Sequence, residues 1–248
     1  GQATRLEPWL TKMDKLYSGQ IQLGLATDTD DVTGRAMATH DGEWPEAETI
    51  RQVLQAREGE GDQLPPAFSA IQVDGKRAHR AARAGQPLDL PLRRVTAHRL
   101  ELLNYQPPLV DFRAEVSSGY YIRSLARDVG AELGLGGCLS ALRREKVGPW
   151  SLAGAVTLEE LAAWTEEDWA ARLAPPAEAL PHLPGLPLTA TEARGFGQGK
   201  KLPVSAGTGQ YKILSPSGEL LGLGEISSIG GSAPQEPFLR PLRVFPVE

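Results

Sequence analysis

Residues 110–133 show the clearest pattern of hydrophobic and polar positions in the chain, and the pattern predicts a strand followed by a helix. Every second residue from Val110 to Val116 is apolar, which is the period of a half-buried strand. Beyond Gly119 the apolar residues recur at helical spacing instead: Ile122, Leu125, Ala126, Val129 and Leu133. Gly134 follows as a C-terminal stop.

Arg123 therefore falls in the first turn of the predicted helix, where the helix macrodipole disfavours a cation. A cation at this place suggests an anionic partner, either a phosphate or a carboxylate. The alternative is an ordinary surface salt bridge, which is worth at most about 1 kcal/mol.

The same patterns predict further elements on both sides of this junction. Strands are expected over residues 16–25 and 93–105, and a helix over 45–57 that stops near Gly59. Residues 136–150 are expected to form a loop that leads into another strand.

The region around residues 150–186 predicts a boundary between domains. Thr157 and Glu160 form a capping box before a short helix, a second helix contains Trp169, and prolines punctuate residues 175–187. The tail is expected to hold a short helix from Thr191 and strands at 211–214, 219–226 and 242–247, which close a small barrel.

Composition narrows the class of protein. The chain of 248 residues has a net charge of −5 and one cysteine, Cys138, which excludes an internal disulfide and argues against a zinc enzyme. It has neither an apolar run of about 20 residues nor a signal peptide, so we expect a cytoplasmic protein without membrane contact.

Charge is distributed unevenly, and the distribution indicates a polyanionic partner. Residues 72–99 are strongly basic, whereas residues 151–180 are strongly acidic. Within residues 64–90 a proline-rich turn, an Asp-Gly hairpin signal and a short Ala-rich basic helix follow one another. Its thin apolar face predicts a loosely held excursion; a solvated charged helix is the alternative reading.

Several ordered blocks resemble the TruB family of tRNA pseudouridine synthases. These are Gly1-Gln2-Ala3-Thr4-Arg5, Lys15-Leu16-Tyr17, Thr27-Asp28-Thr29-Asp30-Asp31-Val32-Thr33-Gly34, Pro65-Pro66-Ala67-Phe68-Ser69-Ala70, Gly75-Lys76, Ala82-Arg83-Ala84-Gly85, Gly119-Tyr120-Tyr121-Ile122-Arg123 and Leu142-Arg143-Arg144. The tail resembles the small RNA-binding barrel of the PUA type that members carry.

The resemblance implies an α+β fold with a mixed, mainly antiparallel sheet flanked by helices. Residues 1–150 would form the catalytic core with a thumb loop at 64–90, residues 151–185 a helical connector, and residues 186–248 a PUA-like domain. The implied reaction converts the T-loop uridine of tRNA (position 55) to pseudouridine, with no cofactor and no metal. The alternative is a non-catalytic tRNA-binding protein or tRNA folding assistant.

The resemblance also assigns roles to individual residues. Tyr17 would stack on the flipped base and Arg123 would pair with the catalytic aspartate. The residues implied to bind the substrate are Tyr121, Leu142 and Asp31. Those implied to bind the tRNA stem and loop are Phe68, Lys76, Arg77, His79, Arg80, Arg83, Arg143 and Arg144.

One block of the family pattern has no counterpart in this sequence. The family's nucleophilic aspartate lies in a Gly-x-Leu-Asp-Pro-x-Ala-x-Gly block immediately upstream of the element at which this sequence begins. We therefore expect the chain to lack its N-terminal segment, to be inactive alone, and to have that segment as a possible partner; a divergent protein without it is the alternative. Arg123 is then expected to face solvent, an anion or a substitute carboxylate.

Overall fold

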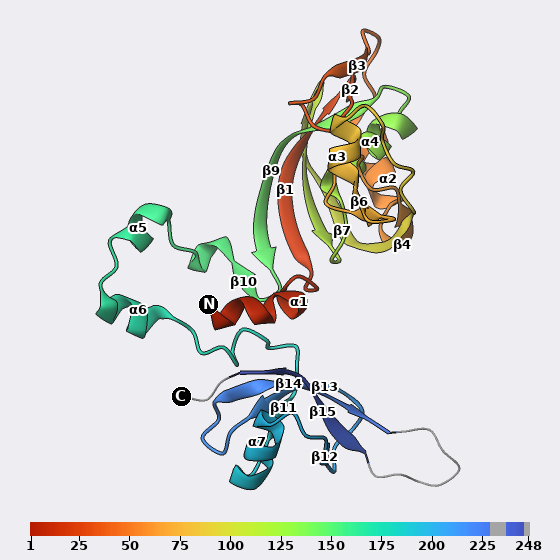
Figure 1. Ribbon diagram of the computed structural model, residues 1–248. Helices are drawn as coiled ribbons and strands as arrows, with labels where there is room; N and C mark the ends of the chain where they lie inside the picture. The colour runs from red at the N-terminus through yellow and green to blue at the C-terminus, as the bar shows by residue number, and fades with distance from the viewer. Residues whose placement is uncertain (229–236, 246–248) are drawn as a thin grey trace. The chain divides into compact units, whose positions relative to one another are not determined.

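A six-stranded antiparallel sheet organises residues 12–155, one of two compact units in the chain (Figure 1). The computed structural model describes residues 1–228 and 237–245. The strand order is β10-β9-β1-β8-β7-β4. The strands are β1 (Lys15–Leu23), β4 (Gly59–Gln63), β7 (Arg93–Gln106), β8 (Leu109–Val116), β9 (Gly137–Val147) and β10 (Trp150–Ser151).

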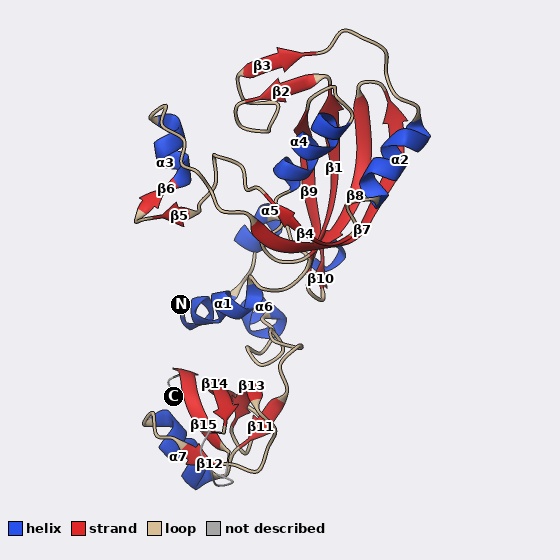
Figure 2. Cartoon of the chain, turned by 90° about the vertical axis from the view of Figure 1, so that its right-hand side faces the viewer, coloured by secondary structure: helices blue, strands red, loops and turns tan. Residues whose placement is uncertain are grey.

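Two helices, α2 (Ala47–Gln55) and α4 (Ile122–Glu132), cover one face of this sheet (Figure 2). The alternation predicted for β8 is confirmed, because Val110, Phe112, Ala114 and Val116 are all buried against these helices. Burying such side chains contributes roughly 1.5–3 kcal/mol for each large one, which makes this face the main core of the unit. The opposite face carries polar side chains, among them Gln20, whose amide donates to Asp111 over 2.8 Å.

The predicted excursion at residues 64–90 contains a hairpin and a helix. Strands β5 (Gln72–Val73) and β6 (Lys76–Arg77) flank a two-residue turn, and α3 (Ala78–Arg83) follows directly. Asp74 and Gly75 both have positive φ, 50° and 78°, as the Asp-Gly signal predicts. A second small hairpin, β2 (Leu25–Thr27) with β3 (Ala36–Thr39), encloses the Asp- and Thr-rich loop.

One sequence-based expectation for this unit is wrong, and one strand was missed. The segment expected as a loop from residue 136 is already strand β9, which pairs with β1 over its whole length. Its run of charged residues hid the alternation, since half of the strand is exposed. The helix predicted over 45–57 is confirmed as α2 and ends before Gly59, but residues 59–63 then form strand β4 at the edge of the sheet, which the sequence did not predict because its glycines and acids are exposed.

The other unit comprises residues 1–11 and 156–248. Its five-stranded sheet has the order β11-β13-β14-β15-β12. The strands are β11 (Gly185–Pro187), β12 (Leu202–Pro203), β13 (Gly209–Leu214), β14 (Leu220–Ser227) and β15 (Phe238–Val244). Helix α7 (Ala190–Gly197) buries Phe196 beside them, and the predicted helix and strand pair of the tail are confirmed. The last predicted strand begins earlier, at Phe238, and its residues Pro246 and Val247 lie outside the described residues.

The chain start belongs to this second unit. A 3-10 helix, η1 (Gln2–Leu6), continues into α1 (Glu7–Leu10), and both Leu6 and Trp9 pack in a cluster with Leu180 and Leu223. The indole of Trp9 also donates to the side chain of Gln210 over 2.8 Å.

Two short helices, α5 (Leu158–Ala162) and α6 (Glu166–Arg172), precede the second sheet. Both begin with a capping box; the one at Thr157 is the predicted one, and the one at Thr165, closed by Asp168 instead of a glutamate, was not predicted. A 3-10 turn, η2 (Leu152–Gly154), precedes them. Among the residues that the structure describes, no helix has the length and apolar character needed to cross a membrane.

Helix α4 approaches strand β9 so closely that only glycine fits at the crossing. A Cβ on Gly130 would clash with the backbone of Gly136 and Gly137, and a Cβ on Gly137 would lie 2.7 Å from the carbonyl oxygen of Ala126. The Gly130 carbonyl also accepts hydrogen bonds from the amides of Leu135 and Gly136, both at 3.0 Å.

We expect Gly130→Ala to destabilise the protein by about 1–3 kcal/mol, because the added methyl forces the helix away from the strand. Gly61→Ala is the matched control, since a Cβ there meets nothing within 4 Å and its φ is not positive. Urea denaturation followed by circular dichroism measures the difference. Equal midpoints for the two variants would contradict the close-packing explanation.

Candidate active site

The face of the sheet that carries the helices also carries three of the predicted site residues. In the pairing of β1 with β9, Tyr17 lies opposite Arg144 and Gly19 lies opposite Leu142. Residues opposite each other in an antiparallel pair share a face of the sheet. Tyr17 packs against the core cluster, whereas Leu142 is 47% exposed. This face of the sheet is therefore packed into the core at Tyr17 and accessible to solvent at Leu142.

A β-bulge in β9 determines which side chains reach this surface. Gln20 lies opposite Ala141 but Ile21 lies opposite Leu139, so Ser140 is an extra residue in the ladder. The hydroxyl of Ser140 donates to the Gln20 carbonyl, at 3.0 Å, which satisfies it at the irregularity. Without the bulge, strict alternation would place Ala141 rather than Leu142 on the face of buried Leu139.

The same alternation separates the two adjacent arginines that the sequence analysis grouped together. Arg143 lies opposite Ser18, on the face away from the helices, whereas Arg144 shares the face of Tyr17. Arg143 there borders a shallow depression together with Gln20, Asn104 and Asp111. The structure thus brings only Arg144 beside Tyr17.

Arg123 is expected to face solvent, an anion or a substitute carboxylate, and its hydrogen-bond partners in the structure are two backbone carbonyls. The side chain lies in the first turn of α4, is partly buried, and donates from Nη1 to the Thr29 carbonyl (3.3 Å) and from Nη2 to the Phe68 carbonyl (2.9 Å). Within residues 1–228 and 237–245 no carboxylate forms an ion pair with it. Two backbone carbonyls satisfy the cation instead and leave its charge uncompensated by a direct partner.

The start of α4 also holds the chain that leads into residues 64–90. Buried Gln63 bonds the Tyr121 backbone in both directions: its Oε1 accepts from the Tyr121 amide (2.8 Å) and its Nε2 donates to the Tyr121 carbonyl (3.1 Å). The Leu64 carbonyl accepts from the hydroxyl of Ser124 (2.8 Å) and from Arg127 (2.9 Å).

The Asp- and Thr-rich loop between β2 and β3 is also fixed to helix α4. Arg127 forms an ion pair with Asp30 (3.1 Å) and with Asp128 (2.8 Å). Burial raises the pKa of the Asp30 carboxyl above its ordinary value, although Arg127 opposes this effect. The Asp30 carbonyl accepts from the Leu139 amide at 3.0 Å, which connects the loop to β9.

Asp31 lies in this loop, and both its carboxylate and its carbonyl accept hydrogen bonds from residues of the same loop. Its Oδ1 accepts from the hydroxyl (2.6 Å) and the amide (3.0 Å) of Thr33. Its carbonyl accepts from the hydroxyl of Thr27 over 2.8 Å. Because Arg123 binds the carbonyl of Thr29, Asp31 and Arg123 belong to neighbouring parts of one network.

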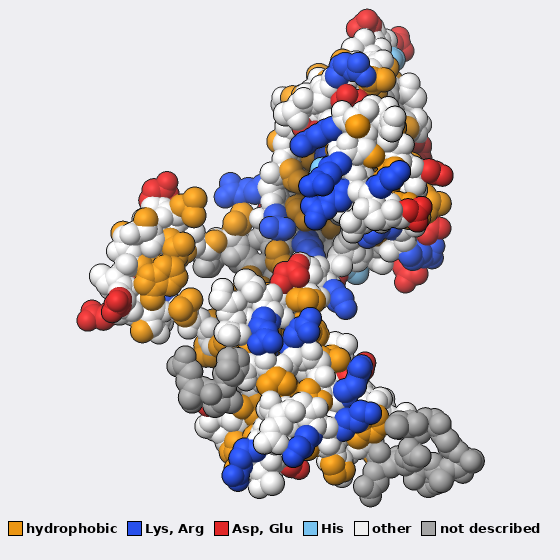
Figure 3. Space-filling model, in the orientation of Figure 1, with side chains coloured by type: hydrophobic (Ala, Val, Ile, Leu, Met, Phe, Trp, Pro, Cys, Tyr) orange, Lys and Arg blue, Asp and Glu red, His pale blue; other side chains and the backbone are white. Residues whose placement is uncertain are grey.

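The basic residues predicted for RNA binding gather around α3, where Figure 3 shows a group of Lys and Arg side chains. Lys76, Arg77, Arg80 and Arg83 are all exposed, while Phe68 and His79 are half-buried. Beneath them a small cluster of Ile71, Ala78 and Leu90 contacts Tyr121. This contact places Tyr121 between the excursion and the start of α4.

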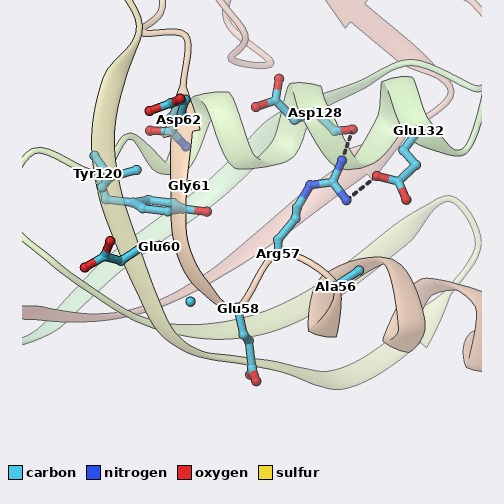
Figure 4. A pocket seen from close by; sticks show the side chains of 12 residues that line it. Ala56, Arg57, Glu58, Glu60, Gly61, Asp62, Tyr120, Asp128 and Glu132 are labelled. Atoms are coloured by element: carbon cyan, nitrogen blue, oxygen red, sulfur yellow. Dashed lines mark hydrogen bonds and ion pairs between the residues drawn. The ribbon is translucent and has the colours of Figure 1, made fainter.

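A separate pocket is lined by the segment from the end of α2 through β4 and by Asp128 and Glu132 of α4 (Figure 4). Its cavity volume is about 500 Å³, and Arg57 crosses it to reach the Asp128 carbonyl (2.8 Å) and the Glu132 carboxylate. Tyr120 also lines it, and burial raises the pKa of this phenol to about 12. The other charged lining residues are acidic: Glu58, Glu60 and Asp62. An acidic lining repels phosphates, so this pocket does not fit RNA.

Four residues of this network escaped the sequence analysis: Asp30, Gln63, Ser124 and Arg127. The spacing of Arg123 and Arg127 was the available signal, because residues four apart lie on one face of a helix and both cations therefore point to the same surroundings. Gln63 and Ser124 act through backbone partners that are distant in sequence, and no local pattern announces them.

Comparison with known proteins identifies the family of the chain. The family model described as "TruB family pseudouridylate synthase (N terminal domain)" matches residues 1–122, and "tRNA pseudouridylate synthase B C-terminal domain" matches residues 123–180. A protein named tRNA pseudouridine synthase B from Synechococcus sp. (strain WH7803) is 42% identical over 96% of this chain and 81% of its own length. One of the same name from Thermobifida fusca (strain YX) is 39% identical over 94% of this chain and 80% of its own.

Solved structures give the same picture at the level of the fold. A chain described as "Crystal Structure of a Cbf5-Nop10-Gar1 Complex" has a TM-score of 0.72 and 25% identity, over 98% of this chain and 70% of that one. Another, from "Structure of H/ACA RNP bound to a substrate RNA containing 2'-deoxyuridine", has a TM-score of 0.68 at 22% identity, over 99% of this chain and 70% of that one. With two family models in sequence and relatives about 40% identical along nearly the whole chain, this protein belongs to the TruB family of pseudouridine synthases.

Proposed function

We propose that this protein acts on the T stem and loop of tRNA and isomerises the uridine at position 55 to pseudouridine. The observation that carries the proposal is the meeting of Tyr17, Leu142 and Arg144 on one accessible face, beside a network in which two backbone carbonyls bind Arg123 and no carboxylate of the described residues forms an ion pair with it. The implied reaction breaks the C1′–N1 bond, turns the base and rejoins it to C1′ through C5.

The chemistry requires the uridine to leave the base stack, at a cost of a few kcal/mol that contacts to the base must offset. Tyr17 offers an aromatic face for stacking, and Tyr121 and Leu142 offer apolar walls. Arg123 supplies a fixed cation for the nucleophilic aspartate that the resemblance implies, and an adjacent cation keeps a carboxylate ionised. Asp31 is proposed as a polar contact for the base.

The tRNA contacts are proposed on the basic surface around α3. Exposed Lys76, Arg77, Arg80 and Arg83 can each pair with a phosphate, and half-buried Phe68 offers a ring to a base. We further propose that the five-stranded sheet that begins with β11 is a PUA-like RNA-binding barrel and that the segment before it, from residue 151, connects it to the catalytic core built on the six-stranded sheet. An enzyme of this kind acts on tRNA in the cytoplasm.

The decisive test is pseudouridine formation by the protein encoded by the complete gene, with a T stem-loop RNA as substrate. We expect conversion of the position 55 uridine and no reaction when that base is replaced by cytidine. Tight binding without modification of any T-loop uridine would favour the alternative, a tRNA-binding protein or folding assistant.

Replacing Lys76, Arg77 and Arg80 together with alanine is expected to weaken tRNA binding. The slope of log affinity against log salt should fall by up to about 2.7, since each phosphate contact contributes about 0.9. Filter binding at salt concentrations from about 50 to 200 mM measures the slope, because the affinity falls steeply over that range. Alanine at Arg51, Arg99 and Arg172, exposed cations outside this surface, is the control and should leave the slope unchanged. An unchanged slope in the first variant would remove this surface from the binding account.

Tyr17 is tested by two substitutions in the complete enzyme. Tyr17→Phe should retain stacking, whereas Tyr17→Leu should lower kcat/KM about 5- to 150-fold, because base–aromatic stacking is worth roughly 1–3 kcal/mol. Steady-state kinetics on the T stem-loop distinguish the two. Equal activity of Tyr17→Leu and the unaltered enzyme would show that the ring does not stack on the base.

A further inference from the structure

The peptide between Phe68 and Ser69 joins the basic excursion to Arg123. The Phe68 carbonyl accepts from Arg123 Nη2 at 2.9 Å. The next carbonyl, that of Ser69, accepts from both the amide and the ring Nδ1 of His79, each at 3.1 Å. Two consecutive carbonyls therefore hold a cation of the candidate site and the first turn of α3.

The ring of His79 is fixed in one tautomer by this contact. A carbonyl oxygen only accepts hydrogen bonds, so Nδ1 must carry the proton. The two bonds from His79 hold the Ser69 carbonyl and with it the peptide between Ser69 and Ala70. The Phe68 carbonyl belongs to the peptide just before it and is joined to it through the Cα of Ser69 alone, so a displacement of the Ser69 carbonyl is passed to the contact with Arg123 across one residue.

Arg123 has a second tether whose position does not depend on the excursion. Its Nη1 donates to the Thr29 carbonyl, and the loop around Thr29 is bonded to β9 through the Asp30 carbonyl and the Leu139 amide. One side of the guanidinium is thus anchored to the sheet and the other to the excursion. When the excursion moves, the contact with the Phe68 carbonyl changes and the contact with the Thr29 carbonyl stays.

The excursion is held weakly enough to move. Its buried cluster contains only Ile71, Ala78 and Leu90. The hydroxyl of Ser69 is buried, with 4% of the residue exposed, and has no hydrogen-bond partner in the described part of the chain. An unsatisfied buried hydroxyl destabilises the arrangement that contains it, which favours exchange with another arrangement.

We propose that His79 is a positioning residue for Arg123. By holding the Ser69 carbonyl, His79 aims the Phe68 carbonyl at Arg123 Nη2, so that the position of α3 on its RNA sets the position of the guanidinium. The inference rests on the proposed function for its catalytic consequence, but the coupling itself is a property of the chain without RNA.

The coupling is tested on this chain without RNA, by NMR of the arginine side chains. Arg123 is assigned from the signal lost in Arg123→Lys. His79→Phe keeps the ring but removes the donor, and we expect it to shift and broaden the Arg123 guanidinium signal and to raise hydrogen exchange of the His79 amide roughly fivefold. His79→Asn places an amide N–H close to the position of Nδ1 and should restore both.

His98→Phe is the matched control, because His98 lies on β7 and pairs with Asp14 instead. It should leave the Arg123 signal unchanged. An Arg123 signal that is the same in His79→Phe and the unaltered chain would overturn the proposal, whatever the activity of the enzyme.

The catalytic consequence is measured in the complete enzyme. His79→Phe should lower kcat about tenfold while the affinity for T stem-loop RNA stays within about twofold, and His79→Asn should recover kcat. A loss of RNA affinity with kcat at saturation unchanged would show that His79 is only an RNA contact and would overturn the proposal. If the unaltered enzyme forms no pseudouridine, the proposed function fails, and the NMR result still decides the coupling.

Discussion

The first turn of α4 is the constraint on which the rest of the catalytic unit depends. Four of its side-chain and backbone groups bind carbonyls or amides of segments far away in sequence, at Thr29, Gln63, Leu64 and Phe68. Each contact satisfies a polar group that burial would otherwise leave unpaired, at a cost of about 1–3 kcal/mol. The helix start therefore fixes two loops at once through hydrogen bonds. The apolar face of the helix packs separately against the sheet.

This arrangement explains why core and site can share one face of a sheet. Phe112 and Ala114 face α4 and α2, and Tyr17 and Gly19, opposite them on β1, continue the face outward. Gly19 has to be small, since a Cβ there would lie 2.7 Å from the Phe112 ring. The rigidity of the core is thereby transmitted to Tyr17 without a separate support. A ring on a strand is positioned more firmly than one on a loop.

The sequence predicted the elements whose period is local and missed those that depend on partners. The strand at 110–116, the helix from Ile122 and the Asp74-Gly75 turn follow from alternation, helical spacing and turn chemistry. Strand β9 was interpreted as a loop because its run of charged residues hides the alternation. The strand can carry these charges beside β1 because most of them are exposed. For the site, the resemblance pointed to Tyr17, Leu142 and Arg123. It did not reveal that Arg123 is bound by carbonyls, because hydrogen bonds to the backbone leave no trace in side-chain identity.

The bulge at Ser140 has a consequence for how this family can tolerate change in length. The side chains of a strand alternate with a period of two, so one inserted or deleted residue exchanges the two faces of everything beyond it. Ser140 is the extra residue of the ladder, so its deletion would restore regular pairing and leave Arg144 on the face of Tyr17, whereas deletion of Leu142 would turn Arg143 toward Tyr17 and Arg144 away from it. The bulge is therefore the place where this strand can lose a residue without changing its surface: a sequence aligned with a gap at Ser140 presents the same arginine beside Tyr17, and one with a gap at Leu142 presents the other.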